Sequence, residues 1–196
     1  MSARLRLVSL WMPRRMMDRE VERIRARTDA ALDALLAVHA PGAAANEEDG
    51  PGLDTRAAMA RGHERRVRAL IDAVGREKAI ALGREALYPV GVALGREARG
   101  RLAARDTLDD LVRAAGVMYR VLGIEFSMAS GPEGRRMVVS RCALSRHYSP
   151  EACMMLSAVD EGAVSGLCPR AAMRFTERIT DGSPCCVATI EIGEGA

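Results

Sequence analysis

Residues 123–142, GIEFSMASGPEGRRMVVSRC, change the hydrophobic period of the chain from that of a helix to that of a strand. Apolar Ile124, Phe126 and Met128 alternate with polar residues, and a second run, RRMVVSRC, follows the turn sequence GPEG. A period of two places successive side chains on opposite faces of a sheet. The stretch therefore predicts a strand, a tight turn and a second strand.

The sequence after this stretch predicts one helix and a second pair of strands. Ser149-Pro150 has the form of a helix cap followed by proline at the first helical position, and the helix should extend to about Gly166. The runs AAMRFTERI (171–179) and CCVATIEI (185–192) are joined by TDGSP, which predicts a second hairpin. Two hairpins with a helix between them predict a mainly antiparallel four-stranded sheet.

The sequence before residue 123 has the period of helices. Apolar residues recur every three or four positions in 18–39, 55–74 and 108–122. The fold class is therefore predicted as α+β, with a helical N-terminal half followed by the four-stranded sheet. We expect residues 1–55 to form an N-terminal helix and a flexible loop, PGAAANEEDGPG, and residues 56–196 to form a single α+β domain.

A repeated sequence lies inside the helical half. ALGREA occurs at 81–86 and again at 93–98. Twelve residues of helix rotate by about 120°, so the two copies are not expected to share a face. Pro89, between them, is expected to kink or divide the segment.

Composition excludes several classes of protein. The net charge is only +3, with acidic and basic residues interleaved, so a nucleic-acid partner is not expected. No apolar run is long enough to span a membrane, and the N-terminus lacks a signal-peptide cleavage site, so a cytoplasmic protein is expected. All five cysteines lie in the last third without a CxxC spacing, which predicts free thiols.

Asp160 is the acidic residue that the sequence places in apolar surroundings. On the predicted helix, its neighbours three and four positions away are Leu156, Ala163 and Val164. Two interpretations stay open: a structural aspartate bonded to backbone, or a cleft-facing acid or base whose pKa is raised by burial. The next residue, Glu161, is expected to face solvent.

Cys142 and His147 lie where the second strand ends and the chain turns toward the helix. A thiol near a helix N-terminus is a candidate thiolate nucleophile, with His147 as its base. The plainer interpretation makes Cys142 a small buried hydrophobe and His147 an exposed turn residue.

The last two strands carry the remaining candidates. Cys186 shares a side with Ala188 and is directed into the more apolar layer, whereas Cys185 points to the other side. Arg174 and Arg178 fall on one side of the third strand. They form either part of a solvated sheet face or a clamp for a substrate carboxylate.

The series RCALSRHYSPEAC (141–153), then Asp160, then GLCPRAAMRFTERITDGSPCCVATIEI (166–192) resembles the family of L-2-amino-thiazoline-4-carboxylate hydrolases. The resemblance extends over roughly residues 76–192. It implies that Cys142 corresponds to the cysteine of the family, Asp160 to its aspartate, and Gly182 with Cys186 to its closing glycine and cysteine.

The resemblance implies hydrolysis of a carbon–nitrogen bond in a small cyclic amidine such as 2-aminothiazoline-4-carboxylate. Cys142 would then be the thiolate nucleophile or a water-orienting group, Asp160 the acid or base, and Cys186 a cavity wall or second thiol. Arg174 and Arg178 would bind the substrate carboxylate.

Three alternatives remain beside this hypothesis. In the first, zinc is held by Cys142, His147, Asp160 and Cys186, because thiolates suit that metal. In the second, the protein is a non-catalytic binding domain, since GSPCC also resembles the end of vinyl-reductase-like (V4R) small-molecule-binding domains. In the third, the N-terminal helices form the interface of a homo-oligomer.

Overall fold

The computed structural model describes residues 3–42, 54–105, 107–131 and 134–193. These residues form the elements α1 (Ala3–Leu10), α2 (Arg14–His39), α3 (Thr55–Val74), α4 (Arg76–Leu102), α5 (Leu108–Val121), β1 (Ile124–Gly131), β2 (Gly134–Cys142), α6 (Pro150–Leu167), β3 (Ala171–Glu177), the 3-10 helix η1 (Ile179–Asp181) and β4 (Cys186–Ile192). The predicted α+β fold is confirmed. Most of the loop expected at 41–52 lies outside the described residues.

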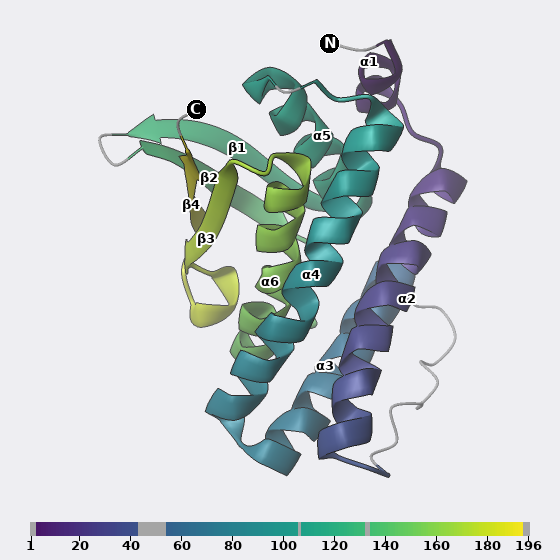
Figure 1. Ribbon diagram of the computed structural model, residues 1–196, viewed down its shortest axis with the longest axis vertical. Coiled ribbons are helices and arrows are strands. Elements are labelled where there is room, and N and C mark those ends of the chain that lie inside the picture. The colour runs from purple at the N-terminus through teal and green to yellow at the C-terminus, as the bar shows by residue number, and fades with distance from the viewer. Residues whose placement is uncertain (1–2, 43–53, 106, 132–133, 194–196) are drawn as a thin grey trace.

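The four strands form one antiparallel sheet in the order β1-β2-β4-β3. Helices α5 and α6 pack on the same face of this sheet, where they share a core with Met137, Val139, Met173 and Ala188. Helix α4 covers the other side of α6, and α2 and α3 pack beyond it (Figure 1). Helix α6 is therefore enclosed between the sheet and the helical half of the molecule.

The N-terminal segment forms two helices where the sequence predicts one. Helix α1 precedes Pro13, and α2 begins at Arg14. Arg120 of α5 donates hydrogen bonds to the carbonyls of Val8 and Ser9, which fixes the C-terminal end of α1. In the described part of the chain, no helix combines the length and hydrophobicity needed to cross a membrane.

Glycines allow the backbones of α4 and α6 to touch. Gly91 and Gly95 of α4, and Gly162 and Gly166 of α6, lie so close to the opposite helix that a Cβ atom would collide with a carbonyl oxygen. The two glycines of each pair are four residues apart and therefore lie next to each other on one face of their helix. Because neither has a side chain, the backbone at this face is uncovered. The contact buries α6 on the side opposite the sheet.

The expected separation of the two ALGREA copies and the expected division of the helix at Pro89 were wrong. Both ALGREA copies contact α6 through their glycines, Gly83 and Gly95. Residues four positions apart on a helix differ in direction by only about 40°, so they form a ridge that winds slowly around the helix. A packed helix can follow this ridge, which is why two glycines twelve residues apart can contact the same helix. Pro89 does not divide α4. Proline has no backbone N–H, so the Glu85 carbonyl lacks its usual helical hydrogen bond from residue 89. Both residues are exposed, and water can donate to this carbonyl instead.

We expect Gly162→Ala to lower the free energy of unfolding by about 1–3 kcal/mol, because the new methyl group would overlap the Tyr88 carbonyl oxygen. Gly100→Ala in α4 is the matched control. Nothing lies near its Cβ position, so alanine should be neutral or stabilise the helix by about 1 kcal/mol. Urea unfolding followed by circular dichroism measures both. Unchanged stability of Gly162→Ala would contradict the close contact.

Candidate active site

A cavity of about 80 Å³ lies between α6, the sheet and helices α2, α3 and α5. The polar and thiol-bearing residues of its lining are Thr28, His63, Tyr119, Cys142, Tyr148, Cys153, Ser157, Asp160, Arg178 and Cys186. The structure thus brings Cys142, Asp160, Arg178 and Cys186 together, although they come from different elements.

Asp160 lies on the side of α6 that faces the cavity, together with Cys153 and Ser157. Burial raises the pKa of Asp160 to about 7; the nearby Tyr119 hydroxyl opposes this shift, and the charge of Glu161 adds to it. A carboxyl group with this pKa is divided between its acid and carboxylate forms at neutral pH. It can therefore donate or accept a proton.

Glu161 is buried, contrary to the expectation that it faces solvent. Its carboxylate lies 2.6 Å from a guanidinium nitrogen of Arg84 in α4. Because α6 is enclosed on both sides, this position is largely shielded from solvent, and Arg84 supplies the partner that a buried charge needs. Arg84 also donates to the Ser157 hydroxyl at 3.1 Å.

A bulge in β2 turns Cys142 toward the cavity. Val139 is buried on the inner face, so strict alternation would point Arg141 inward and Cys142 outward. The pairing with β1 shifts at Ser140, which is the extra residue of the bulge. Arg141 is consequently exposed, and Cys142 lines the cavity.

The environment of Cys142 favours the neutral thiol. Burial raises the pKa of Cys142 to about 11; the backbone N–H groups of Leu144 and Ser145 oppose this shift, and the charge of Asp160 adds to it. The thiol is therefore protonated at neutral pH and is not the thiolate expected from a nearby helix N-terminus. A neutral S–H is a poor nucleophile but can donate a weak hydrogen bond.

A second bulge, in β3, separates Arg178 from Arg174. The pairing of β3 with β4 shifts between Phe175 and Glu177, so Thr176 is the extra residue and the alternation of sides is reversed beyond it. Arg174 is exposed on the outer face of the sheet, whereas Arg178 is buried and lines the cavity. The prediction from the sequence that the two arginines lie on one side of the strand is therefore wrong.

The guanidinium of Arg178 is held from two sides. Its Nη2 donates to the Ser157 hydroxyl at 3.2 Å, and its central carbon lies 5.6 Å from the centre of the Phe175 ring. Its Nε is buried and has no hydrogen-bond partner among the described residues. A buried guanidinium N–H without a partner is suited to an anionic group of a ligand.

Two further thiols line the cavity. The backbone N–H of Ile179 donates to Cys186 Sγ at 3.3 Å, which ties the start of β4 to η1. Burial raises the pKa of Cys186 and of Cys153. Cys185, on the opposite side of its strand, is not part of the lining.

His147 lies apart from Asp160 and Cys186. It lines a surface pocket of about 450 Å³ with Arg141 and Arg146, and this pocket shares only Ile124 and Cys142 with the cavity. Among the residues that the structure describes, no group of three or more His, Cys, Asp or Glu side chains could hold a metal ion. The zinc hypothesis gains no support from this part of the chain.

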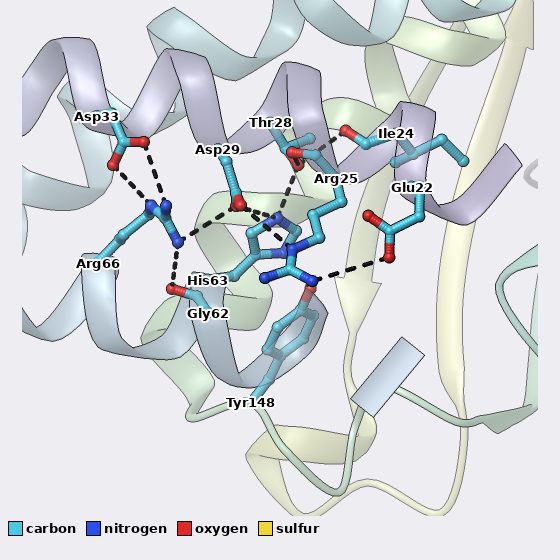
Figure 2. A network of polar contacts seen from close by, with 10 residues as sticks. All are labelled: Glu22, Ile24, Arg25, Thr28, Asp29, Asp33, Gly62, His63, Arg66 and Tyr148. Atoms are coloured by element: carbon cyan, nitrogen blue, oxygen red, sulfur yellow. Dashed lines mark hydrogen bonds and ion pairs between the residues drawn. The ribbon is translucent and has the colours of Figure 1, made fainter. Parts of the chain in front are cut away.

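His63 and Tyr148 line the cavity, although they were not selected from the sequence (Figure 2). His63 lies on α3 between Met59 and Val67, both buried. A polar residue flanked by apolar residues at helical spacing is the pattern that marks Asp160, and it could have identified His63.

We expect iodoacetamide to alkylate Cys142 slowly at pH 7, with a rate that rises about tenfold for each pH unit until the pH approaches 11. The reason is that only the thiolate reacts. Timed labelling followed by peptide mass spectrometry measures the profile. Asp160→Asn should shift the pH profile of the alkylation rate to lower pH, because it removes a negative charge near the thiol. An alkylation rate that reaches its plateau below pH 8 in the parent protein would contradict a neutral Cys142 thiol at pH 7.

Comparison with known proteins identifies the family of the chain. A family model described as L-2-amino-thiazoline-4-carboxylic acid hydrolase matches residues 56–189, more than half of the chain. The match extends from α3 into β4 and includes Cys142, Asp160 and Cys186. No curated protein and no solved structure gives a significant match. The chain therefore belongs to the L-2-amino-thiazoline-4-carboxylic acid hydrolase family.

Proposed function

We propose that the cavity is the active site of a hydrolase that opens a small cyclic amidine, such as 2-aminothiazoline-4-carboxylate, at a carbon–nitrogen bond. One observation carries the proposal: Asp160, whose pKa is raised to about 7 by burial, shares a largely apolar cavity with the buried cation of Arg178. Membership of the family supports the substrate class.

The substrate carboxylate binds to Arg178 in this proposal. The Nε–H group has no partner among the described residues, and contacts with Ser157 and Phe175 hold the guanidinium in place before the ligand arrives. The cavity of about 80 Å³ has room for roughly six water-sized spheres, which suits a single five-membered ring. Arg174 lies outside the cavity and is not needed.

Asp160 acts first as an acid. Its proton passes to the ring nitrogen, which makes the carbon between nitrogen and sulfur more electrophilic. A water oxygen bonds to this carbon, and the first proton of the water passes to a base in the cavity wall. When the ring C–N bond breaks, the remaining hydroxyl proton returns to Asp160, and the leaving nitrogen takes the proton from the base. One water is consumed, and the site returns to its initial state.

Water is the proposed nucleophile because the thiol of Cys142, with a pKa of about 11, is protonated at neutral pH. The S–H group lies in the same cavity as Asp160 and orients the attacking water through a weak hydrogen bond. Cys186 forms part of the wall. The largely apolar lining keeps other water away from the reacting carbon.

We expect kcat/KM for 2-aminothiazoline-4-carboxylate to fall above about pH 7, because only protonated Asp160 donates a proton. Asp160→Asn should lower kcat by about 10²–10⁴-fold. Glu161→Gln should move the fall in kcat/KM to lower pH, because loss of the Glu161 charge lowers the pKa of Asp160. A flat profile between pH 6 and pH 9 in the parent enzyme would be inconsistent with this role.

We expect the product to contain a free amine and no thiol, because the ring nitrogen is the atom that receives the proton. Mass spectrometry and a thiol-specific reagent distinguish this product from that of carbon–sulfur cleavage, which releases a thiol. If 2-aminothiazoline-4-carboxylate raises the melting temperature but is not turned over, the non-catalytic binding function replaces the hydrolase proposal.

A further inference from the structure

A chain of hydrogen bonds connects α2 to the cavity through His63 (Figure 2). His63 is only 1% exposed, and its Nδ1 lies 2.8 Å from the Tyr148 hydroxyl. Its Nε2 lies 2.7 Å from the Thr28 hydroxyl and 3.4 Å from a carboxylate oxygen of Asp29. Thr28, His63 and Tyr148 all belong to the cavity lining. A buried imidazole is thus placed between a hydroxyl that reaches the cavity and a carboxylate behind it.

The partners of His63 determine which ring nitrogen carries the proton. The Thr28 hydroxyl has one hydrogen and lies 3.0 Å and 3.1 Å from two backbone carbonyls of α2, which can only accept. The Thr28 hydroxyl therefore donates to the backbone and accepts a hydrogen bond from Nε2–H of His63. The Asp29 carboxylate faces the same N–H group of His63. Nδ1 is left as the acceptor for the Tyr148 O–H.

The surroundings of His63 keep its ring neutral at rest and place a carboxylate beside it. Burial opposes the ionisation of Asp29, but the hydrogen bond with His63 and the charges of Arg66 and Arg25 favour the carboxylate, and the pKa of Asp29 is lowered. Burial lowers the pKa of His63; Arg66 and Arg25 act in the same direction, and Asp29 acts against it. The resting imidazole is therefore neutral, with an ionised carboxylate beside its Nε2–H group.

Tyr148 keeps its own proton in the resting state. Burial raises the pKa of Tyr148 well above 10, and the negative charges that Cys142, Cys153, Asp160 and Asp29 can carry act in the same direction. A free phenolate is therefore disfavoured. The Tyr148 hydroxyl can accept a proton from the cavity only while it gives its own proton to Nδ1 of His63.

We propose that Tyr148 takes up the first proton of the attacking water while it passes its hydroxyl proton to Nδ1 of His63. This inference rests on the proposed hydrolysis. One O–H bond of water and the O–H bond of Tyr148 break, a new Tyr148 O–H bond and an Nδ1–H bond form, and the water oxygen bonds to the substrate carbon. When the ring opens, the proton returns by the same path to the leaving nitrogen. Tyr148 is the catalytic residue, and His63, Thr28 and Asp29 are positioning residues.

The inference makes α2 part of the active site. Thr28 and Asp29 precede residues 56–189, which the family model matches, whereas His63 and Tyr148 lie within them. Helix α2 supplies both groups that hold the proton on Nε2, and its Ile24 also lines the cavity.

Nitrogen-15 NMR of the histidine rings tests the tautomer without a substrate. The chain has three histidines, so His39→Gln and His147→Gln assign the signals of His63. We expect a neutral His63 at pH 7 with its proton on Nε2. Tyr148→Phe should shift the Nδ1 resonance, because its hydrogen bond is lost, and should leave Nε2 protonated. A proton on Nδ1 in the parent would overturn the relay.

Kinetics test the proton transfer itself. With 2-aminothiazoline-4-carboxylate as substrate, Tyr148→Phe should lower kcat by about 10²–10⁴-fold with little change in KM, and it should reduce the solvent isotope effect on kcat. Asp29→Asn should lower kcat by about tenfold or more, because no carboxylate then keeps the proton of His63 on Nε2. Asp33→Asn is the matched control. Asp33 also lies on α2 and binds Arg66 at 2.7 Å, but it is not a partner of His63, so kcat should not change.

The outcomes separate this inference from the proposed function. If the parent opens the thiazoline and Tyr148→Phe retains full kcat, the relay is wrong and the role of Asp160 stands. If Asp33→Asn lowers kcat as much as Asp29→Asn does, the loss of activity comes from the change in charge or stability of α2 and not from the contact with His63. The relay is then overturned. If the parent does not turn over the thiazoline, the proposed function fails, and the proposed proton transfer from the attacking water fails with it. The tautomer is then judged by NMR alone.

Discussion

The contact between α4 and α6 determines the environment of the two acidic residues in the middle of α6, Asp160 and Glu161. Because Gly91, Gly95, Gly162 and Gly166 carry no side chain, the two backbones touch, and α6 is enclosed between α4 and the sheet. A charged residue on an enclosed helix must be paired within the protein or face a cavity. Glu161 is paired with Arg84, and Asp160 faces the cavity. The raised pKa of Asp160 is therefore a consequence of helix packing.

Two β-bulges bring the strand residues to the same cavity. Each bulge adds one residue to a strand and reverses the alternation of sides beyond it, at Ser140 for Cys142 and at Thr176 for Arg178. Alternation counted along the sequence assumes an unbroken register, so it placed Arg174 and Arg178 together. The register depends on the partner strand, and no residue within β3 marks the position of the bulge.

The parts of the structure that depend on local sequence were predictable. The period changes at residue 123, and the caps at Asp54 and Ser149 each accept a backbone hydrogen bond, as their residue types indicate. Helical spacing indicated that Asp160 has apolar neighbours, but it left open whether the carboxyl group bonds to backbone or faces a cavity. The burial of Glu161 did not follow from helical spacing, because it requires a second helix against the opposite side. The partners of His63 could not be predicted either, since Tyr148 lies 85 residues away and Thr28 lies 35 residues away.

Helix α6 also sets the spacing of the groups that would act on the substrate. Ser157, which holds Arg178, and Asp160 are three positions apart on the cavity side of the helix. This spacing corresponds to about one helical turn, or about 5 Å along the axis. A carboxylate bound by Arg178 would then place the atoms of a small ring near Asp160. Tyr148 directly precedes Ser149, the N-cap of α6, and its hydroxyl lies 2.8 Å from His63 of α3. The acid and the proton-accepting hydroxyl are thus carried by one continuous segment, and the close packing of α6 fixes the position of that segment.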